Sequence, residues 1–136
     1  MPDKSAVRTE NASAPFQGAP YSQGIKAGDY VFVSGQLGLR PGEPELVGGV
    51  AEQTEQVFRN LRAILEEAGS SLDRLVKTTV FLADLGDFQA MNEVYRTFFP
   101  EAPPSRATVR ADLMNAEFLS EIQCVAVRDD ARKVVA

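Results

Sequence analysis

The sequence of 136 residues contains no histidine and a single cysteine, Cys124. The lack of histidine excludes a Ser-His-Asp triad, a Cys-His pair, a histidine general base and any histidine-ligated zinc site. One cysteine excludes a cysteine-rich metal site and an intramolecular disulfide, and it fits a reducing compartment such as the cytoplasm. The sequence also has no glycine-rich phosphate-binding motif. We therefore predict that the protein uses neither a metal nor an organic cofactor.

Long hydrophobic runs and basic stripes are also lacking. No apolar run approaches the roughly 20 residues that span a bilayer, so we expect no membrane partner. The first 15 residues, MPDKSAVRTENASAP, have no apolar stretch of the kind that signal peptides contain. The net charge is −5, and without a basic stripe the chain lacks the electrostatic footprint of a nucleic-acid-binding protein. The length is that of one domain, covering residues 1–136, with residues 1–20 partly irregular and residues 129–136 a charged tail.

Two segments have apolar residues at helical spacing. The first is predicted to be a helix over residues 50–69, and the second over residues 86–100. In the first, the apolar positions on one face are Val57, Phe58, Leu61, Ile64, Leu65 and Ala68. In the second, the predicted buried stripe is Phe88, Met91, Val94, Tyr95 and Phe98.

Several segments are rich in β-branched and aromatic residues and are predicted to be strands. They are residues 30–34, 36–39, 75–83, 105–111 and 118–128, with one further short strand at 6–9. The order of the main elements is β-β-α-β-α-β-β, which favours an α+β fold with one mixed sheet and two helices packed on one face. Both faces of residues 118–128 are substantially apolar. Two helices cover one face only, so we expect other subunits to cover the second.

Arg106 opens a predicted strand directly after Pro103 and Pro104. Because proline fixes φ at about −65°, the guanidinium has a well-fixed base. A guanidinium held in this way can bind a carboxylate through two parallel hydrogen bonds. The alternative is an ordinary surface arginine paired with a nearby acid. Arg110 lies on the same strand face and is a competing candidate.

Glu121 lies inside the last predicted strand among apolar residues. A glutamate in such surroundings can have a perturbed pKa and can hold a water molecule, although an exposed or intersubunit ion pair would explain it equally well. Cys124 faces the other side of the strand, and without a histidine to activate it we interpret it as a buried structural thiol.

Four further residues are weaker candidates. Tyr21 follows a proline-fixed turn in GAPYSQG, where simple packing is an equal explanation. Ser34 and Gly35 end a predicted strand, where the glycine would form a bend or allow close approach to a ligand. Asn92 lies in the middle of the second predicted helix, where asparagine is a mediocre helix former. We interpret it as exposed or bonded to a neighbouring loop.

Taken together, these segments resemble the RidA/YjgF family of reactive enamine/imine deaminases. The matching pieces occur in family order over almost the whole chain, and the more specific ones are VKTTVFLADLGDF and PPSRATV. The others are TENASAP, GAPYSQG, VFVSGQLGL and SEIQCVAV. The resemblance implies a chorismate-mutase-like α+β fold and a homotrimer with active sites in the clefts between subunits.

The resemblance also assigns roles to residues. The carboxylate-binding arginine of the family falls on Arg106, its water-orienting glutamate on Glu121 and its active-site tyrosine on Tyr21. A backbone contact falls on Gly35, and Asn92 matches a helix asparagine that we interpret as structural. Ser34, Phe88 and Thr108 are expected to line the substrate pocket. Thr108 stands where many members have a cysteine, which excludes a thiol role, and Met114-Asn115 replaces the usual Leu-Pro at the pocket rim.

The implied activity is hydrolysis of 2-imino acids and their enamine tautomers, of the 2-iminobutanoate/2-iminopropanoate deaminase type, to 2-keto acids and ammonia. The ligands would be small 2-imino and 2-keto acids. One alternative is a non-catalytic binder of small carboxylates that keeps the fold and Arg106. A third is the endoribonuclease or translation-inhibitor label of some family members, which the acidic charge and the lack of histidine disfavour.

Overall fold

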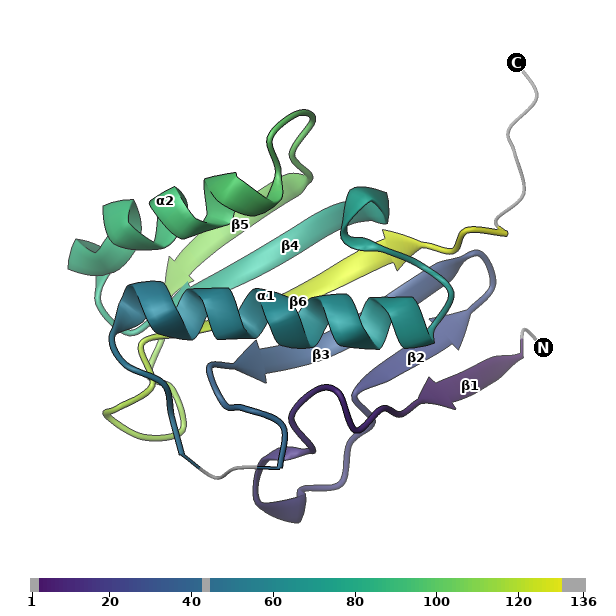
Figure 1. Cartoon of the computed structure of the whole chain (residues 1–136), viewed down its shortest axis with the longest axis horizontal. Helices are drawn as coiled ribbons and strands as arrows, with labels where there is room; N and C mark the ends of the chain where they lie inside the picture. The colour runs from purple at the N-terminus through teal and green to yellow at the C-terminus, as the bar shows by residue number, and fades with distance from the viewer. Residues whose placement is uncertain (1–2, 43–44, 131–136) are drawn as a thin grey trace.

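The computed structural model of the chain describes residues 3–42 and 45–130. These residues form one six-stranded sheet with two α-helices on one of its faces (Figure 1). The strands are β1 (Lys4–Val7), β2 (Gly24–Ala27), β3 (Tyr30–Leu37), β4 (Leu75–Leu82), β5 (Ser105–Arg110) and β6 (Ser120–Val127). The helices are α1 (Val50–Glu67) and α2 (Phe88–Phe98), with 3₁₀ turns η1 (Phe16–Gly18), η2 (Leu72–Arg74) and η3 (Leu85–Asp87). The predicted α+β architecture is confirmed.

The sheet is mixed, with the strand order β1-β2-β3-β6-β4-β5. β4 and β5 are parallel neighbours joined through α2, whereas the other neighbouring pairs are antiparallel. A parallel pair needs a crossover long enough to return the chain to the same end of the sheet, and α2 supplies it. This connection makes β5 an edge strand and lays α2 beside it, which determines the surroundings of Arg106.

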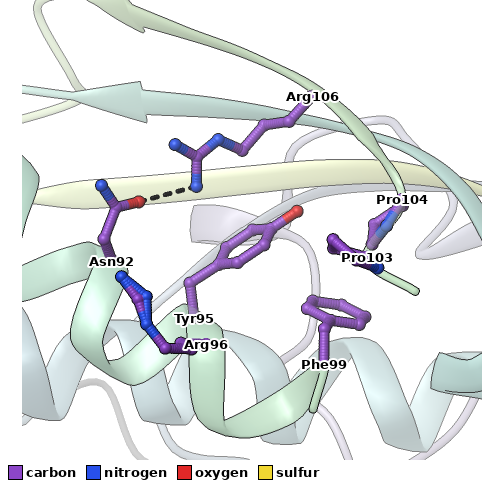
Figure 2. Close-up of a pocket in the computed structure, with 7 residues that line it drawn as sticks. All are labelled: Asn92, Tyr95, Arg96, Phe99, Pro103, Pro104 and Arg106. Carbon is purple, nitrogen blue, oxygen red and sulfur yellow. Dashed lines mark hydrogen bonds between the residues drawn. The ribbon is translucent and has the colours of Figure 1, made fainter. Parts of the chain in front are cut away.

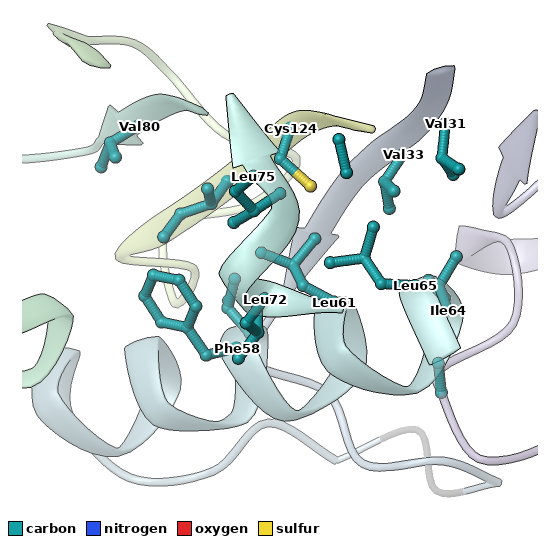
Figure 3. Close-up of a cluster of buried hydrophobic side chains, with 14 of the residues drawn as sticks. Val31, Val33, Phe58, Leu61, Ile64, Leu65, Leu72, Leu75, Val80 and Cys124 are labelled. Atoms are coloured by element: carbon teal, nitrogen blue, oxygen red, sulfur yellow. The ribbon is translucent and has the colours of Figure 1, made fainter. Parts of the chain in front are cut away.

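The core lies between α1 and the sheet. The predicted apolar face of α1 is buried in full, and Figure 3 shows its side chains and those of the strands pointing toward one another. The helix begins where the Glu52 carboxylate accepts a hydrogen bond from the Gly49 amide at 3.1 Å. It ends before Gly69, whose φ of +77° is a left-handed conformation that favours glycine. The helix predicted over residues 50–69 is therefore confirmed, and its observed end at Glu67 lies within one turn of the predicted end.

Three strand predictions were wrong in detail. Residues 30–34 and 36–39 are not two strands, because β3 runs continuously through Ser34 and Gly35 with a bulge opposite β6. The short strand predicted at 6–9 lies at Lys4–Val7. β2 was not predicted, because its sequence GIKA has little β propensity and is held in the sheet by pairing with β1 and β3.

The sheet face opposite the helices is open in the single chain. The side chains of Ile122, Cys124 and Ala126 are buried against the helices, so the alternate residues of β6 lie on the open face. The large apolar side chains exposed on this face include Phe32 at 47% and Val109 at 43%. The single chain therefore leaves the second face uncovered, as the sequence predicted.

Among the described residues, no helix is both long enough and apolar enough to cross a bilayer. Of the charged tail predicted at 129–136, residues 131–136 lie outside the described part of the chain. The predicted cytoplasmic location stays a prediction.

Candidate active site

Arg106 is the second residue of β5 and pairs in register with Thr78 of β4. Its guanidinium extends toward α2, where Nη1 donates a hydrogen bond to Oδ1 of Asn92 at 2.7 Å. The same guanidinium lies over the ring of Tyr95, with Cζ 4.7 Å from the ring centroid, and 5.6 Å from the ring of Phe88 (Figure 2). The three partners occupy one face of α2 at positions i, i+4 and i+7. The helix thus holds the arginine in one orientation.

The charge of Arg106 is not neutralised within the described part of the chain. No described carboxylate forms an ion pair or hydrogen bond with it, and its contacts are the uncharged groups named above. The side chain is half-buried. A half-buried guanidinium without an acid partner has hydrogen-bond donors with which it can bind an external anion.

A hollow of about 330 Å³ lies between α2 and the start of β5 (Figure 2). Its wall is largely apolar, with Arg106 and Arg96 as the charged members. The lining residues are Asn92, Tyr95, Arg96, Phe99, Pro103, Pro104 and Arg106. The two prolines that precede β5 therefore shape the wall beside the guanidinium as well as fixing the backbone that leads to it.

Phe88 is not part of a buried stripe, which corrects the prediction for α2. Met91 and Tyr95 are buried, but Phe88 is 40% exposed. It lies at the first turn of α2, and within the described part of the chain the sheet has no strand beyond β5. Its exposed ring adjoins Arg106 and is available to contact a bound molecule.

Glu121 lies on the open face, where it is half-buried. No described residue forms a hydrogen bond or ion pair with its carboxylate. Burial raises the pKa of Glu121 above its ordinary value, because removal from water disfavours the charged form. A carboxylate in this state has unused acceptor capacity for a water molecule or a ligand.

Gly35 explains how Glu121 fits against β3. A Cβ atom at Gly35 would overlap Oε2 of Glu121 and would lie 3.0 Å from its Cδ. Glycine at the β3 bulge therefore leaves room for the carboxylate in this position, and a larger residue would force the end of the Glu121 side chain to move. The structure brings these two predicted site residues together.

Tyr21 and Ser34 are linked through Ser22, which follows Tyr21 in the chain and is hydrogen-bonded to Ser34. The Tyr21 hydroxyl accepts a hydrogen bond from the Phe16 amide at 2.7 Å, and its ring is exposed. Ser34 donates to the carbonyl of Ser22 at 2.6 Å, and its amide donates to the carbonyl of Gln23. Ser34 thus ties the segment that contains Tyr21 to the strand that contains Gly35.

The predicted residues fall into two groups on opposite faces of the sheet. Arg106 pairs with Thr78, whose side chain is buried on the helix side. Glu121 pairs with Phe81, which pairs in turn with Val109 on the open face. β5 and β6 are also separated by β4, which is two strand spacings or about 10 Å. Thr108 alternates with Val109 and so shares the helix-side face with Arg106 and Arg110.

Cys124 is confirmed as a buried thiol, and burial raises its pKa to about 12. Burial therefore favours the protonated thiol over the reactive thiolate at neutral pH. No cluster of three or more cysteine, aspartate or glutamate side chains that could hold a metal occurs within residues 3–42 and 45–130.

A family model described as Endoribonuclease L-PSP matches residues 11–128. The chain belongs to the RidA/YjgF family. A RutC family protein of Pyrococcus abyssi is 44% identical over 93% of this chain and 98% of its own length. A mouse protein named 2-iminobutanoate/2-iminopropanoate deaminase is 40% identical over 85% of this chain and 86% of its own length. The family thus includes reactive-intermediate deaminases.

The solved structures of family members have the same fold. The crystal structure of Escherichia coli TdcF with bound serine matches with a TM-score of 0.85 and 34% identity. The match covers 91% of this chain and 99% of TdcF. The ligand of that family member is a small amino acid that carries a carboxylate.

Proposed function

We propose that this protein hydrolyses 2-imino acids and their enamine tautomers to 2-keto acids and ammonia. The observation that supports this most is the Arg106 guanidinium, which is half-buried, fixed by α2 and without an acid partner among the described residues. The carboxylate of a small molecule supplies the acid partner that this guanidinium lacks. The name of the mouse relative and the serine bound to TdcF support the same substrate class.

The reaction needs a carboxylate-binding group and a positioned water. Arg106 binds the substrate carboxylate through two hydrogen bonds, which fixes the adjacent C2 carbon. Glu121 accepts a hydrogen bond from water and takes its proton as the oxygen attacks C2. The π-electron pair of the C2–nitrogen double bond passes to nitrogen, to which Glu121 returns the proton, and a carbinolamine results. The hydroxyl proton then passes to the nitrogen, the C2–nitrogen single bond breaks as ammonia leaves, and the C2–oxygen double bond of the keto acid forms. No electron is transferred, so no redox partner is required.

The remaining predicted residues have supporting roles in this proposal. Gly35 allows the Glu121 carboxylate to lie against the β3 backbone, next to the attacking water. Tyr21 donates a hydrogen bond to the substrate. Ser34, Phe88 and Thr108 lie beside the substrate in the site formed between copies of the chain.

We further propose that each site is built from two copies of the chain. In a 2-imino acid the carboxylate carbon is bonded directly to C2, at about 1.5 Å. Arg106 and the water on Glu121 must therefore lie within a few ångströms of each other. In one chain they extend from opposite faces of the sheet, on strands separated by β4. A neighbouring copy that docks its open face against the edge of β5 brings the two groups together.

A homotrimer is the expected assembly, and replacement of Phe32 by aspartate is expected to disrupt it. The aspartate would be buried without a partner in an apolar interface, which is strongly unfavourable. Sedimentation should give three times the chain mass for the native protein, and a monomer without activity for Phe32→Asp. Leu85→Asp is the control, because Leu85 is equally exposed but lies outside the sheet. A native protein that is a stable monomer at micromolar concentration would remove the shared site.

The activity is tested with an amino-acid oxidase that releases 2-imino acids into solution. The protein should accelerate their disappearance and the release of ammonia well beyond the spontaneous rate. If the protein binds pyruvate without accelerating the reaction, it is a non-catalytic binder of small carboxylates. Binding and cleavage of RNA at low salt would instead support the ribonuclease function, which the net charge of −5 disfavours.

Exhaustive treatment with a chelator is expected to leave the activity unchanged. The sequence has no histidine and one cysteine, and the proposed chemistry uses carboxylate, guanidinium and water alone. Turnover is to be compared before and after chelation and after addition of divalent cations. Loss of turnover with recovery on metal addition would contradict the mechanism.

A further inference from the structure

Arg106 is held by two uncharged partners of different kinds. Asn92 accepts a hydrogen bond at Nη1, at 2.7 Å, and the Tyr95 ring lies beneath Cζ, at 4.7 Å. Figure 2 shows the second terminal nitrogen of the guanidinium pointing away from both partners. The Nε and Nη2 edge is thus left for the two parallel hydrogen bonds that a carboxylate makes.

Tyr95 is itself fixed to the core. Its hydroxyl shares a 2.8 Å hydrogen bond with Oγ1 of Thr78, which is fully buried. Its ring contacts those of Phe58 and Phe99, with centroids 5.3 and 5.0 Å away. Burial raises the pKa of Tyr95, so the phenol stays neutral and does not compensate the guanidinium charge.

A carboxylate in the place of Asn92 would orient the guanidinium equally well, but it would also neutralise the positive charge of the guanidinium. Substrate would then have to displace an internal acid, at the loss of part of the binding free energy. An amide and an aromatic face orient the cation without neutralising it, and the ring attracts it as well.

We propose that Asn92 and Tyr95 are positioning residues that form a neutral platform for Arg106, which keeps its charge available for the substrate carboxylate. This inference rests on the proposed function, because it takes Arg106 as the carboxylate-binding group. From the sequence, Asn92 is interpreted as exposed or bonded to a neighbouring loop, and by the family resemblance as structural, whereas Tyr95 is placed in a buried stripe. Their part at the site follows from the contacts with Arg106.

The decisive variant is Asn92→Asp, which is nearly isosteric and adds a carboxylate next to Nη1. Binding of pyruvate, measured by calorimetry on the intact assembly, is expected to weaken about tenfold or more, as expected when a charge-assisted pair must be displaced. The KM for 2-imino acids should rise by a similar factor with a smaller change in kcat. The unfolding midpoint should be unchanged or raised, because an ion pair is gained. Gln89→Glu is the matched control, since Gln89 is exposed on the same helix and makes no contact with Arg106.

Tyr95 is tested by two replacements. Tyr95→Phe keeps the ring and should bind pyruvate within about threefold of the native protein, whereas Tyr95→Leu removes the ring and should lose about 2- to 30-fold. If Tyr95→Leu does not fold, Asn92→Asp still decides the question. Native affinity in Asn92→Asp overturns the platform.

Arg106→Ala separates failure of this inference from failure of the function. If Arg106→Ala loses pyruvate binding while Asn92→Asp retains it, the platform alone is wrong. If Arg106→Ala itself binds pyruvate as the native protein does, the proposed carboxylate site is wrong and the platform fails with it.

Discussion

Replacing Arg106 with alanine is expected to lower kcat/KM for 2-imino acids by about 30-fold to several thousandfold. This range corresponds to the 2–5 kcal/mol, roughly, that is lost when one partner of a desolvated, hydrogen-bonded charge pair is truncated. The fold should survive, because the guanidinium lies at the edge of the sheet and not in the core. Steady-state kinetics with oxidase-generated imines provide the measurement.

Two further arginine variants make this prediction specific. Arg106→Lys keeps the charge but loses the planar pair of donors, so its activity should lie between those of the native protein and Arg106→Ala. Arg110 lies on the same face of β5 but is exposed, and Arg110→Ala should retain activity within about twofold, as surface substitutions away from a site usually do. If Arg110→Ala abolishes activity while Arg106→Ala does not, Arg106 is not the carboxylate-binding residue.

Replacing Glu121 with glutamine is expected to lower kcat by about 10²- to 10⁴-fold, the usual contribution of a positioned general base. Glutamine has nearly the same shape and can still contact water, but it cannot take the proton. The KM and the affinity for pyruvate should change little, because the carboxylate of the ligand is bound by Arg106.

The stability of this variant distinguishes a catalytic from a structural glutamate. In its own chain Glu121 is a half-buried carboxylate without a partner among the described residues, so the unfolding midpoint of Glu121→Gln should equal or exceed that of the native protein. Glu117→Gln is the control, since Glu117 is exposed near the start of the same strand. Native turnover in Glu121→Gln would show that Glu121 is a structural residue and does not take part in catalysis.

Much of the fold could be predicted from periodicity. The apolar positions of α1 recur at helical spacing and all of them are buried, and the faces of β6 follow directly from alternation. β2 could not be predicted, because three of its four residues, all except Ile25, have low β propensity and become a strand through pairing with neighbours on both sides. β3 was predicted as two strands because of its bulge. At the bulge, Ser34-Gly35 interrupts the alternation of apolar and polar residues by which a strand is predicted from sequence.

The candidate site could be predicted in its parts but not in its arrangement. The proline pair before Arg106 and the apolar neighbours of Glu121 singled out both residues. Their placement on opposite faces depends on the registers of β4 with β5 and β6, which strand sequences alone do not specify. Phe88 was wrongly predicted to be buried. Helical spacing shows which residues share a face of the helix, but it does not show where the sheet beneath the helix ends.

The most direct test of the shared site is to mix the two inactive variants, Arg106→Ala and Glu121→Gln, under conditions in which subunits exchange. In a cyclic assembly each site takes its arginine from one copy and its glutamate from the next, so equal mixing restores about a quarter of the native sites. Kinetics of the exchanged sample should therefore show about a quarter of native turnover, whereas each variant alone stays inactive. Mixed assemblies that form, as judged by mass, yet remain inactive would contradict a site built from Arg106 of one copy and Glu121 of another.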